Sequence, residues 1–168
     1  MNYKHIILTR FNLQYDLQSN IHIQDSWLEE RFRLFDQYCF PSIIAQTNQQ
    51  FDWVILVSDQ TPKNYLSRLA KHTNSHLNIY IELCTYYEDV NVLYNNIGEK
   101  YVHGYDYLLS TRVDNDDMLA KDFVETLQKL LPATHASAVL TFTNGIQWFE
   151  HKDMAFAVAY DRNHFLSF

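Results

Sequence analysis

The chain has 168 residues, a formal net charge of −7, 12 Tyr and 11 Phe, but only three Gly and three Pro. This length predicts a single domain over residues 1–168. An acidic surface repels a phosphate backbone, which argues against a nucleic-acid partner. Cys39 and Cys84 stand apart, which favours a reduced, cytoplasmic setting. No apolar run approaches the roughly 20 residues of a membrane span, whereas contact with the inner face of the membrane through a partner, and a homo-oligomer, remain open.

The first predicted elements are a short strand and a long helix. The apolar run Ile6–Leu8 predicts the strand, and the apolar spacing in residues 25–46 predicts the helix. Ser26 and Glu29, three residues apart, predict a capping box at the start of this helix. Pro41 should kink or end the helix, because it cannot donate a backbone hydrogen bond.

The middle of the chain alternates strands with helices. Residues 51–59 are apolar enough for a strand buried on both faces. Thr61, followed by a proline, predicts the N-cap of a helix over residues 61–72. Residues 77–83 predict a third strand, and residues 90–102 a third helix with an apolar face.

The last part of the chain ends in a predicted antiparallel unit. The pair Asn144 and Gly145 is a strong signal for a hairpin turn between two strands. The predicted elements here are a strand over 105–113, a helix over 120–132, hairpin strands over 137–143 and 146–150, and a final strand over 154–160.

This order, βαβαβαβαβββ, predicts an α/β fold of the Rossmann-like kind. Alternating strands and helices form a mostly parallel sheet with helices on both faces, and the final strands should form an antiparallel part. Ligands of such sheets bind beyond the carboxyl ends of the strands. The segments TRFN (9–12), SDQT (58–61) and TRVDNDD (111–117) should therefore meet at one edge.

Three carboxylates crowd together after the fourth predicted strand. Asp114, Asp116 and Asp117 should repel one another, and this crowding makes sense where a cation binds. Asp114 and Asp116 form a DxD pair whose side chains point to the same side of an extended segment. Bound Mn²⁺ or Mg²⁺ at Asp116 and Asp114 is one interpretation. A helix N-cap at Asp116 or Asp117 is the alternative.

Other polar residues follow the strands at the same edge. Asp59 is a candidate for hydrogen bonds to a nucleobase or ribose, or it is a turn residue. Arg10 and Arg112 are candidates for binding a diphosphate, because the guanidinium fork suits phosphate oxygens. In the alternative for Arg112, it pairs with Asp114 or Asp117 and holds the acidic loop together.

Taken together, these motifs resemble the rhamnosyltransferase family of GT-A-type glycosyltransferases. The resemblance spans about Ile6 to Gly145 and rests on ILTRFN, WLEERFRLFDQYCFPSIIAQTNQQFDWVILVSDQTP, TRVDNDD and NGI. It implies a GT-A fold and a metal-dependent glycosyltransferase with a nucleotide-sugar donor and a glycan or lipid-linked acceptor. By this resemblance Asp114 and Asp116 bind the donor and its Mn²⁺ or Mg²⁺, and Asp59 lies at the nucleobase position.

The resemblance leaves the catalytic base open. An inverting transferase needs a carboxylate near the acceptor hydroxyl, and Glu150, Asp153 and Asp161 are the acids after the predicted turn. Glu150 and Asp153 are the candidates. The chain ends soon afterwards, so the acceptor side is expected to be short or missing. A non-catalytic nucleotide-sugar-binding remnant or partner subunit is therefore the alternative function, and a Mg²⁺-dependent phosphatase ranks below it.

Overall fold

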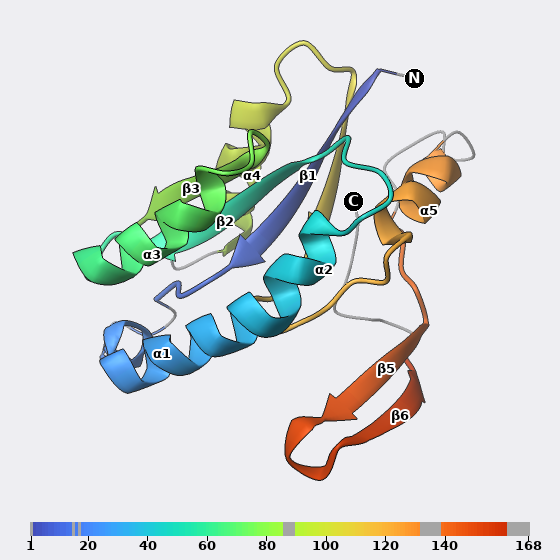
Figure 1. Cartoon of the computed structure of the whole chain (residues 1–168). Helices are drawn as coiled ribbons and strands as arrows, with labels where there is room; N and C mark the ends of the chain where they lie inside the picture. Colours follow the sequence, from blue (N-terminus) through green and yellow to red (C-terminus); the bar gives the residue numbers. More distant parts are fainter. Residues whose placement is uncertain (1, 15, 17, 86–89, 132–138, 161–168) are drawn as a thin grey trace.

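A four-stranded parallel sheet forms the centre of the molecule, and helices cover both of its faces (Figure 1). A separate antiparallel hairpin follows near the end of the described chain. These features confirm the predicted α/β class with its mostly parallel sheet and antiparallel part. The computed structural model describes all residues except 1, 15, 17, 86–89, 132–138 and 161–168.

The sheet has the strand order β3-β2-β1-β4 with every pair parallel. Five consecutive residues of β1 and six consecutive residues of β2 are buried, as expected for central strands covered on two faces. Because all four strands run the same way, their carboxyl ends lie at one edge of the sheet. The strands are β1 (Tyr3–Arg10), β2 (Asp52–Ser58), β3 (Ile79–Cys84) and β4 (Tyr107–Arg112).

The long helix predicted after β1 consists of three consecutive pieces. They are α1 (Asp25–Leu34), a π-helical turn η2 (Phe35–Cys39) and α2 (Phe40–Ile44). Pro41 lies in the first turn of α2, directly after the π-helical turn. A proline is tolerated at the first turn of a helix, because the backbone N–H that it lacks would have no partner within that helix. The helix therefore continues through the proline.

Two predicted helix caps are wrong. Helix α1 begins at Asp25 with Gln24 as its N-cap and no side-chain cap hydrogen bond, so Ser26 already lies within the helix. Helix α3 (Lys63–Thr73) has Pro62 at its N-cap. The Thr61 hydroxyl instead donates to the Ser58 carbonyl at 2.7 Å, because it is buried beside the end of β2.

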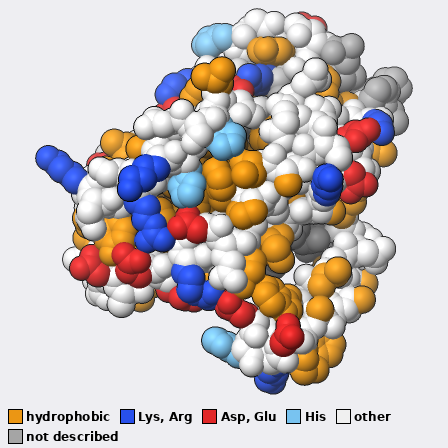
Figure 2. All heavy atoms as spheres, in the orientation of Figure 1, with side chains coloured by type: hydrophobic (Ala, Val, Ile, Leu, Met, Phe, Trp, Pro, Cys, Tyr) orange, Lys and Arg blue, Asp and Glu red, His pale blue; other side chains and the backbone are white. Residues whose placement is uncertain are grey.

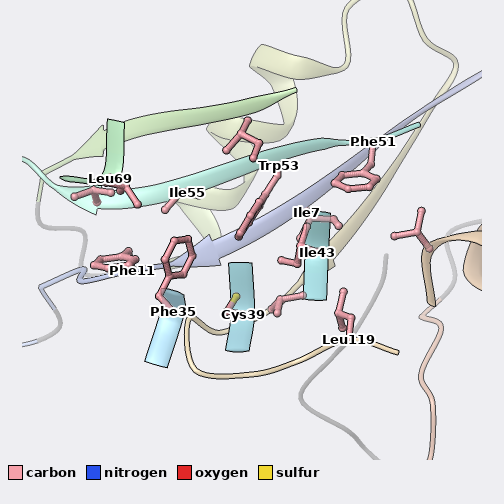
Figure 3. Close-up of a cluster of buried hydrophobic side chains, with 14 of the residues drawn as sticks. Ile7, Phe11, Phe35, Cys39, Ile43, Phe51, Trp53, Ile55, Leu69 and Leu119 are labelled. Carbon is pink, nitrogen blue, oxygen red and sulfur yellow. The ribbon is translucent and has the colours of Figure 1, made fainter. Parts of the chain in front are cut away.

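The main core lies between the sheet and the helices α1, α2, α3 and α5 (Phe123–Leu130). Figure 3 shows Phe35, Cys39 and Ile43 pointing from the helix toward Trp53 and Ile7 on the sheet. All five side chains are at most 1% exposed. This packing fixes the continuous helix of α1, η2 and α2 against β1 and β2, and it thereby determines where α1 meets the strand ends.

Helix α4 (Val90–Tyr101) covers the opposite face of the sheet. Its residues Leu93 and Ile97 are buried against the sheet, as their helical spacing predicts. Gly98 allows close approach, since a Cβ there would lie 2.9 Å from a methyl carbon of Leu108. Within the described residues, no helix combines the length and hydrophobicity that crossing a bilayer requires.

The hairpin contains the largest departure from the predicted elements. Asn144 and Gly145 begin strand β5 (Asn144–Phe149) instead of forming the turn. The chain turns at η4 (Glu150–Lys152) and Asp153, whose φ of +48° is left-handed, and it returns as β6 (Met154–Ala159). Of the strand expected over 137–143, residues 137 and 138 lie outside the described part, and the remainder has only an isolated bridge.

Hydrophobic side chains gather on the surface of this hairpin, at the lower right of Figure 2. Ile146 is 77% exposed, and the aromatic rings of both strands remain about two-fifths exposed or more. A two-stranded hairpin buries little apolar area by itself, so its attachment to the rest of the chain matters. That attachment runs through Arg33 and Tyr38, which both donate hydrogen bonds to Glu150 in the turn of the hairpin.

Candidate functional site

A pocket of about 380 Å³ lies beyond the carboxyl ends of β1 and β4. The segment after β1 and the start of α1 form one wall, and the acidic loop after β4 forms another. One part of the pocket is apolar or aromatic, and the other is charged. The apolar part includes Leu13, Ile21 and Trp27, and the charged part includes Arg10, Arg31, Asp114 and Asp116.

The Asp114 carboxylate is shared by two guanidinium groups. Arg10 donates to both of its oxygens at 3.0 to 3.3 Å, and Arg112 donates to both at 2.6 and 3.3 Å. Burial alone would raise the pKa of Asp114, but the hydrogen bonds and charges of the two arginines hold that pKa below its usual value. Asp114 therefore orients both arginines, and the structure shows the pairing with Asp114 that was the alternative for Arg112.

Asp116 is paired with an arginine that sequence reasoning did not identify. Arg31, on α1, donates to Asp116 Oδ2 at 2.6 Å, and its guanidinium carbon lies 5.1 Å from the centroid of the Trp27 ring. The two side chains of the ion pair are 30% and 39% exposed. A pair this exposed contributes only about 0–1 kcal/mol, so a competing cation can break it at little cost.

The buried polar residues of the pocket, among them Asn115 and His22, were also missed. Asn115 donates to the Phe11 carbonyl at 2.8 Å and so ties the acidic loop to the segment after β1. His22 is 4% exposed, and within the part of the chain that the structure describes its Nε2 has no hydrogen-bond partner. Its position among scattered histidines carried no sequence signal, whereas Asn115 stands between the acids of the DxD pair.

Asp117 differs from its two acidic neighbours. Among the described residues, none donates a hydrogen bond to its carboxylate. Burial, with the charges of Asp116 and Asp114, raises the pKa of Asp117 to about 6. Neither Asp116 nor Asp117 caps the next helix, because α5 has Asp122 as its N-cap. The N-cap interpretation of the acidic cluster is therefore wrong.

Replacing Asp117 with asparagine should stabilise the fold at pH 7.5 by about 1–3 kcal/mol. The ordinary carboxyl ionises near pH 4, whereas the folded one ionises near pH 6. The folded state therefore loses stability as pH rises between these values, and the loss persists above them. Urea unfolding at pH 3 and pH 7.5 measures the gain, which should nearly vanish at pH 3. Asp122→Asn, at an exposed position, is the control; equal gains at both pH values would contradict the prediction.

Asp59 lies outside this pocket as far as the described lining residues show. It is exposed after β2, and its backbone N–H donates to the Cys84 carbonyl at 2.9 Å. Arg112 is likewise absent from the described lining, although it contacts Asp114. The structure thus brings Arg10, Asp114 and Asp116 together and leaves Asp59 one strand further along the same edge.

Glu150 lies in the turn of the hairpin and is held by α1 and η2. Arg33 donates to both of its oxygens at 2.7 Å, and the Tyr38 hydroxyl donates at 2.8 Å. The hydrogen bonds from Arg33 and then Tyr38 lower the pKa of Glu150 to about 2. Such a carboxylate is a poor proton acceptor, so these contacts point to attachment of the hairpin. Asp153 occupies the exposed left-handed turn. The catalytic role of either acid stays a prediction.

Two carboxylates of the acidic loop have oxygens that could bind a divalent cation. Asp116 keeps one oxygen outside its ion pair, and Asp117 supplies hard oxygen ligands without a described donor. No cluster of three metal-binding side chains occurs among the residues that the structure describes. Mg²⁺, however, is often held by one or two carboxylates with water and substrate phosphate. The loop is thus suited to a cation that arrives with a phosphate ligand.

A protein family matches nearly the whole chain. The family model described as "Putative rhamnosyl transferase" matches residues 5–168. The matched region includes the pocket, the acidic loop and the hairpin. No curated protein matches the chain.

Proposed function

Because the chain belongs to the family described as "Putative rhamnosyl transferase", we propose that it is a glycosyltransferase that uses a nucleotide-sugar donor. The acceptor would be a glycan or lipid-linked sugar, and the transferred sugar would be rhamnose, as the family name suggests. The observation that carries the proposal is the pocket at the strand ends, where Arg10, Arg31, Asp114 and Asp116 line one charged region.

The arginines supply the anion-binding part of this proposal. A nucleotide-sugar carries a diphosphate, and its leaving group gains negative charge as the glycosidic bond breaks. Arg10 is positioned by Asp114, so its guanidinium already has a fixed orientation before the donor binds. Preorganised donors of this kind stabilise developing charge more effectively than mobile ones.

The acidic loop supplies the cation-binding part. Asp116 and Asp117 would hold Mn²⁺ or Mg²⁺. Both oxygens of Asp114 accept hydrogen bonds from Arg10 and Arg112, so its role as a further metal ligand stays a prediction from the DxD pattern alone. When bound, the cation would act as a Lewis acid on the phosphate oxygens. The neighbouring apolar residues Leu13, Ile21 and Trp27 offer a surface suited to the nucleoside.

Replacing Asp116 with alanine should abolish metal-dependent nucleotide binding. The test is thermal unfolding with UDP, dTDP, GDP and CDP, each with and without Mn²⁺ or Mg²⁺. A nucleotide at 100 times its Kd adds about 2.7 kcal/mol, or roughly 5 to 10 °C for a chain of this size. Asp122→Ala, at an exposed acid before α5, is the matched control.

A shift that requires metal and disappears in Asp116→Ala would support the donor site and identify the nucleotide. An equal shift in Asp116→Ala would remove Asp116 from the site. No shift with any nucleotide in the unchanged chain would contradict the proposed function.

The state of Glu150 favours a second candidate, a nucleotide-sugar-binding subunit without catalysis. Its carboxylate is bound by Arg33 and Tyr38 and lies outside the described pocket lining. Incubation with a radiolabelled donor separates the candidates. Release of nucleoside diphosphate in the presence of acceptor indicates transfer, whereas tight donor binding without release indicates the binding subunit.

A further inference from the structure

We propose that Arg31 binds the donor diphosphate, and that Asp116 holds it until a divalent cation takes that carboxylate. This inference rests on the proposed function and assigns a role to a residue outside the acidic motif. It predicts that cation and diphosphate bind cooperatively, partly through the exchange of Arg31 between Asp116 and phosphate.

The first argument is the position of Arg31. It lines the same pocket as Arg10, and its guanidinium lies over Trp27, between the apolar and charged parts. It contacts Asp116 at 2.6 Å and approaches Asn115 Oδ1 at 3.5 Å. A nucleotide that placed its nucleoside against the apolar part would bring its phosphates close to this guanidinium.

The second argument is that Arg31 is held less firmly than the other arginines of the site. Arg10 donates three hydrogen bonds to Asp114, and Arg112 donates two to the same carboxylate. The ion pair of Arg31 uses one nitrogen and one oxygen, and both side chains are about one-third exposed. Its other contacts, a 3.5 Å hydrogen bond to Asn115 Oδ1 and the Trp27 ring, are to uncharged groups. Arg31 is therefore the guanidinium that can change partners without disturbing Asp114.

The third argument is competition for one carboxylate. Mn²⁺ and Mg²⁺ prefer oxygen ligands, and the Asp116 side chain is 39% exposed, against 29% for Asp114. A cation on Asp116 repels the guanidinium and removes its partner. Phosphate oxygens then offer a charge-assisted replacement that suits the guanidinium fork. Binding of one ligand thus favours the other by the same factor.

The test compares the unchanged chain with Arg31→Gln and Arg31→Lys by calorimetric titration. Mn²⁺ is titrated alone, and the best-binding nucleoside diphosphate is titrated with saturating Mn²⁺. Arg31→Gln should bind Mn²⁺ up to roughly fivefold more tightly, because Asp116 loses its competitor. It should bind the diphosphate roughly 10- to 100-fold more weakly. The affinities of Arg31→Lys for Mn²⁺ and for the diphosphate should lie between those of the unchanged chain and Arg31→Gln. Lysine keeps the positive charge but lacks the guanidinium fork.

Arg33→Gln is the matched control, because Arg33 lies on the same helix and contacts Glu30 and Glu150 outside the pocket. It should change neither titration. Unchanged diphosphate affinity in Arg31→Gln, or weaker Mn²⁺ binding, would overturn the role of Arg31 alone. If the unchanged chain binds no nucleoside diphosphate, the proposed function fails, and the inference fails with it.

Discussion

Replacing Asp114 with asparagine is expected to lower the free energy of unfolding by about 2 kcal/mol and to weaken nucleotide binding. The carboxylate compensates Arg10 and Arg112 together, and its side chain is 29% exposed. Removing one partner of a buried pair costs several kcal/mol, whereas an exposed pair costs at most about one. Asp114 is partly buried, so the expected loss of stability lies between these two limits. Urea unfolding at pH 7 measures the loss.

The double variant Arg112→Gln with Asp114→Asn is the control for this prediction. It removes one of the two positive charges that Asp114→Asn leaves uncompensated, so it should recover part of the lost stability. If the double variant is less stable than Asp114→Asn, charge compensation is not the reason for the loss.

The stability contributed by Asp114 should also depend on pH. Because its folded-state pKa lies below the usual 3.8, the stabilisation is fully present above about pH 4. It is lost as pH falls further, when the folded carboxyl takes up its proton. The difference between the unchanged chain and Asp114→Asn should therefore narrow at pH 3.

Replacing Trp53 with alanine is expected to lower the free energy of unfolding by about 3–5 kcal/mol. Its side chain is fully buried, and its ring lies 5.6 Å from Phe35 and 5.9 Å from Phe40, between ring centroids. Its indole N–H also donates to the Thr9 hydroxyl at 2.9 Å. The loss corresponds to a fall in Tm of roughly 6 to 20 °C.

Two further variants keep this prediction testable if the alanine variant does not fold. Trp53→Phe retains a ring in the core but removes the donor to Thr9, so it should cost less than Trp53→Ala. Trp148→Ala removes a tryptophan that is 39% exposed on the hairpin, and it should cost least. A greater loss in Trp148→Ala than in Trp53→Ala would show that the hairpin, and not the sheet, limits stability.

The core around Trp53 and the contact between Arg31 and Asp116 are coupled, because both depend on the continuous helix of α1 and η2. Trp53 and Phe35 fix the helix against the sheet, and Arg31 projects from the same helix toward Asp116. Core variants that shift α1 should therefore weaken the Arg31–Asp116 contact as well as the fold. Measuring nucleotide affinity in Trp53→Phe separates this positional effect from unfolding.

The sequence alone determined the four strands of the parallel sheet and the acidic edge beyond them. A strand buried on both faces needs apolar residues at consecutive positions, and such a run, as in residues 51–59, can be recognised in the sequence itself. Local signals were less decisive at the ends of elements. Asn144 and Gly145 suit a tight turn, yet Asn144 begins β5 and pairs with Ala159 of β6. The register of the whole hairpin places the turn at Glu150–Asp153 instead.

Only the tertiary structure decided which charges meet. Arg31 and Asp116 are 85 residues apart, and Arg33 and Glu150 are 117 residues apart, so no spacing motif could connect them. Residue type indicates that an arginine can bind a carboxylate or a phosphate. Which one it contacts depends on distances of a few ångströms, and these follow from how α1 packs on the sheet and where the loop after β4 and the hairpin lie.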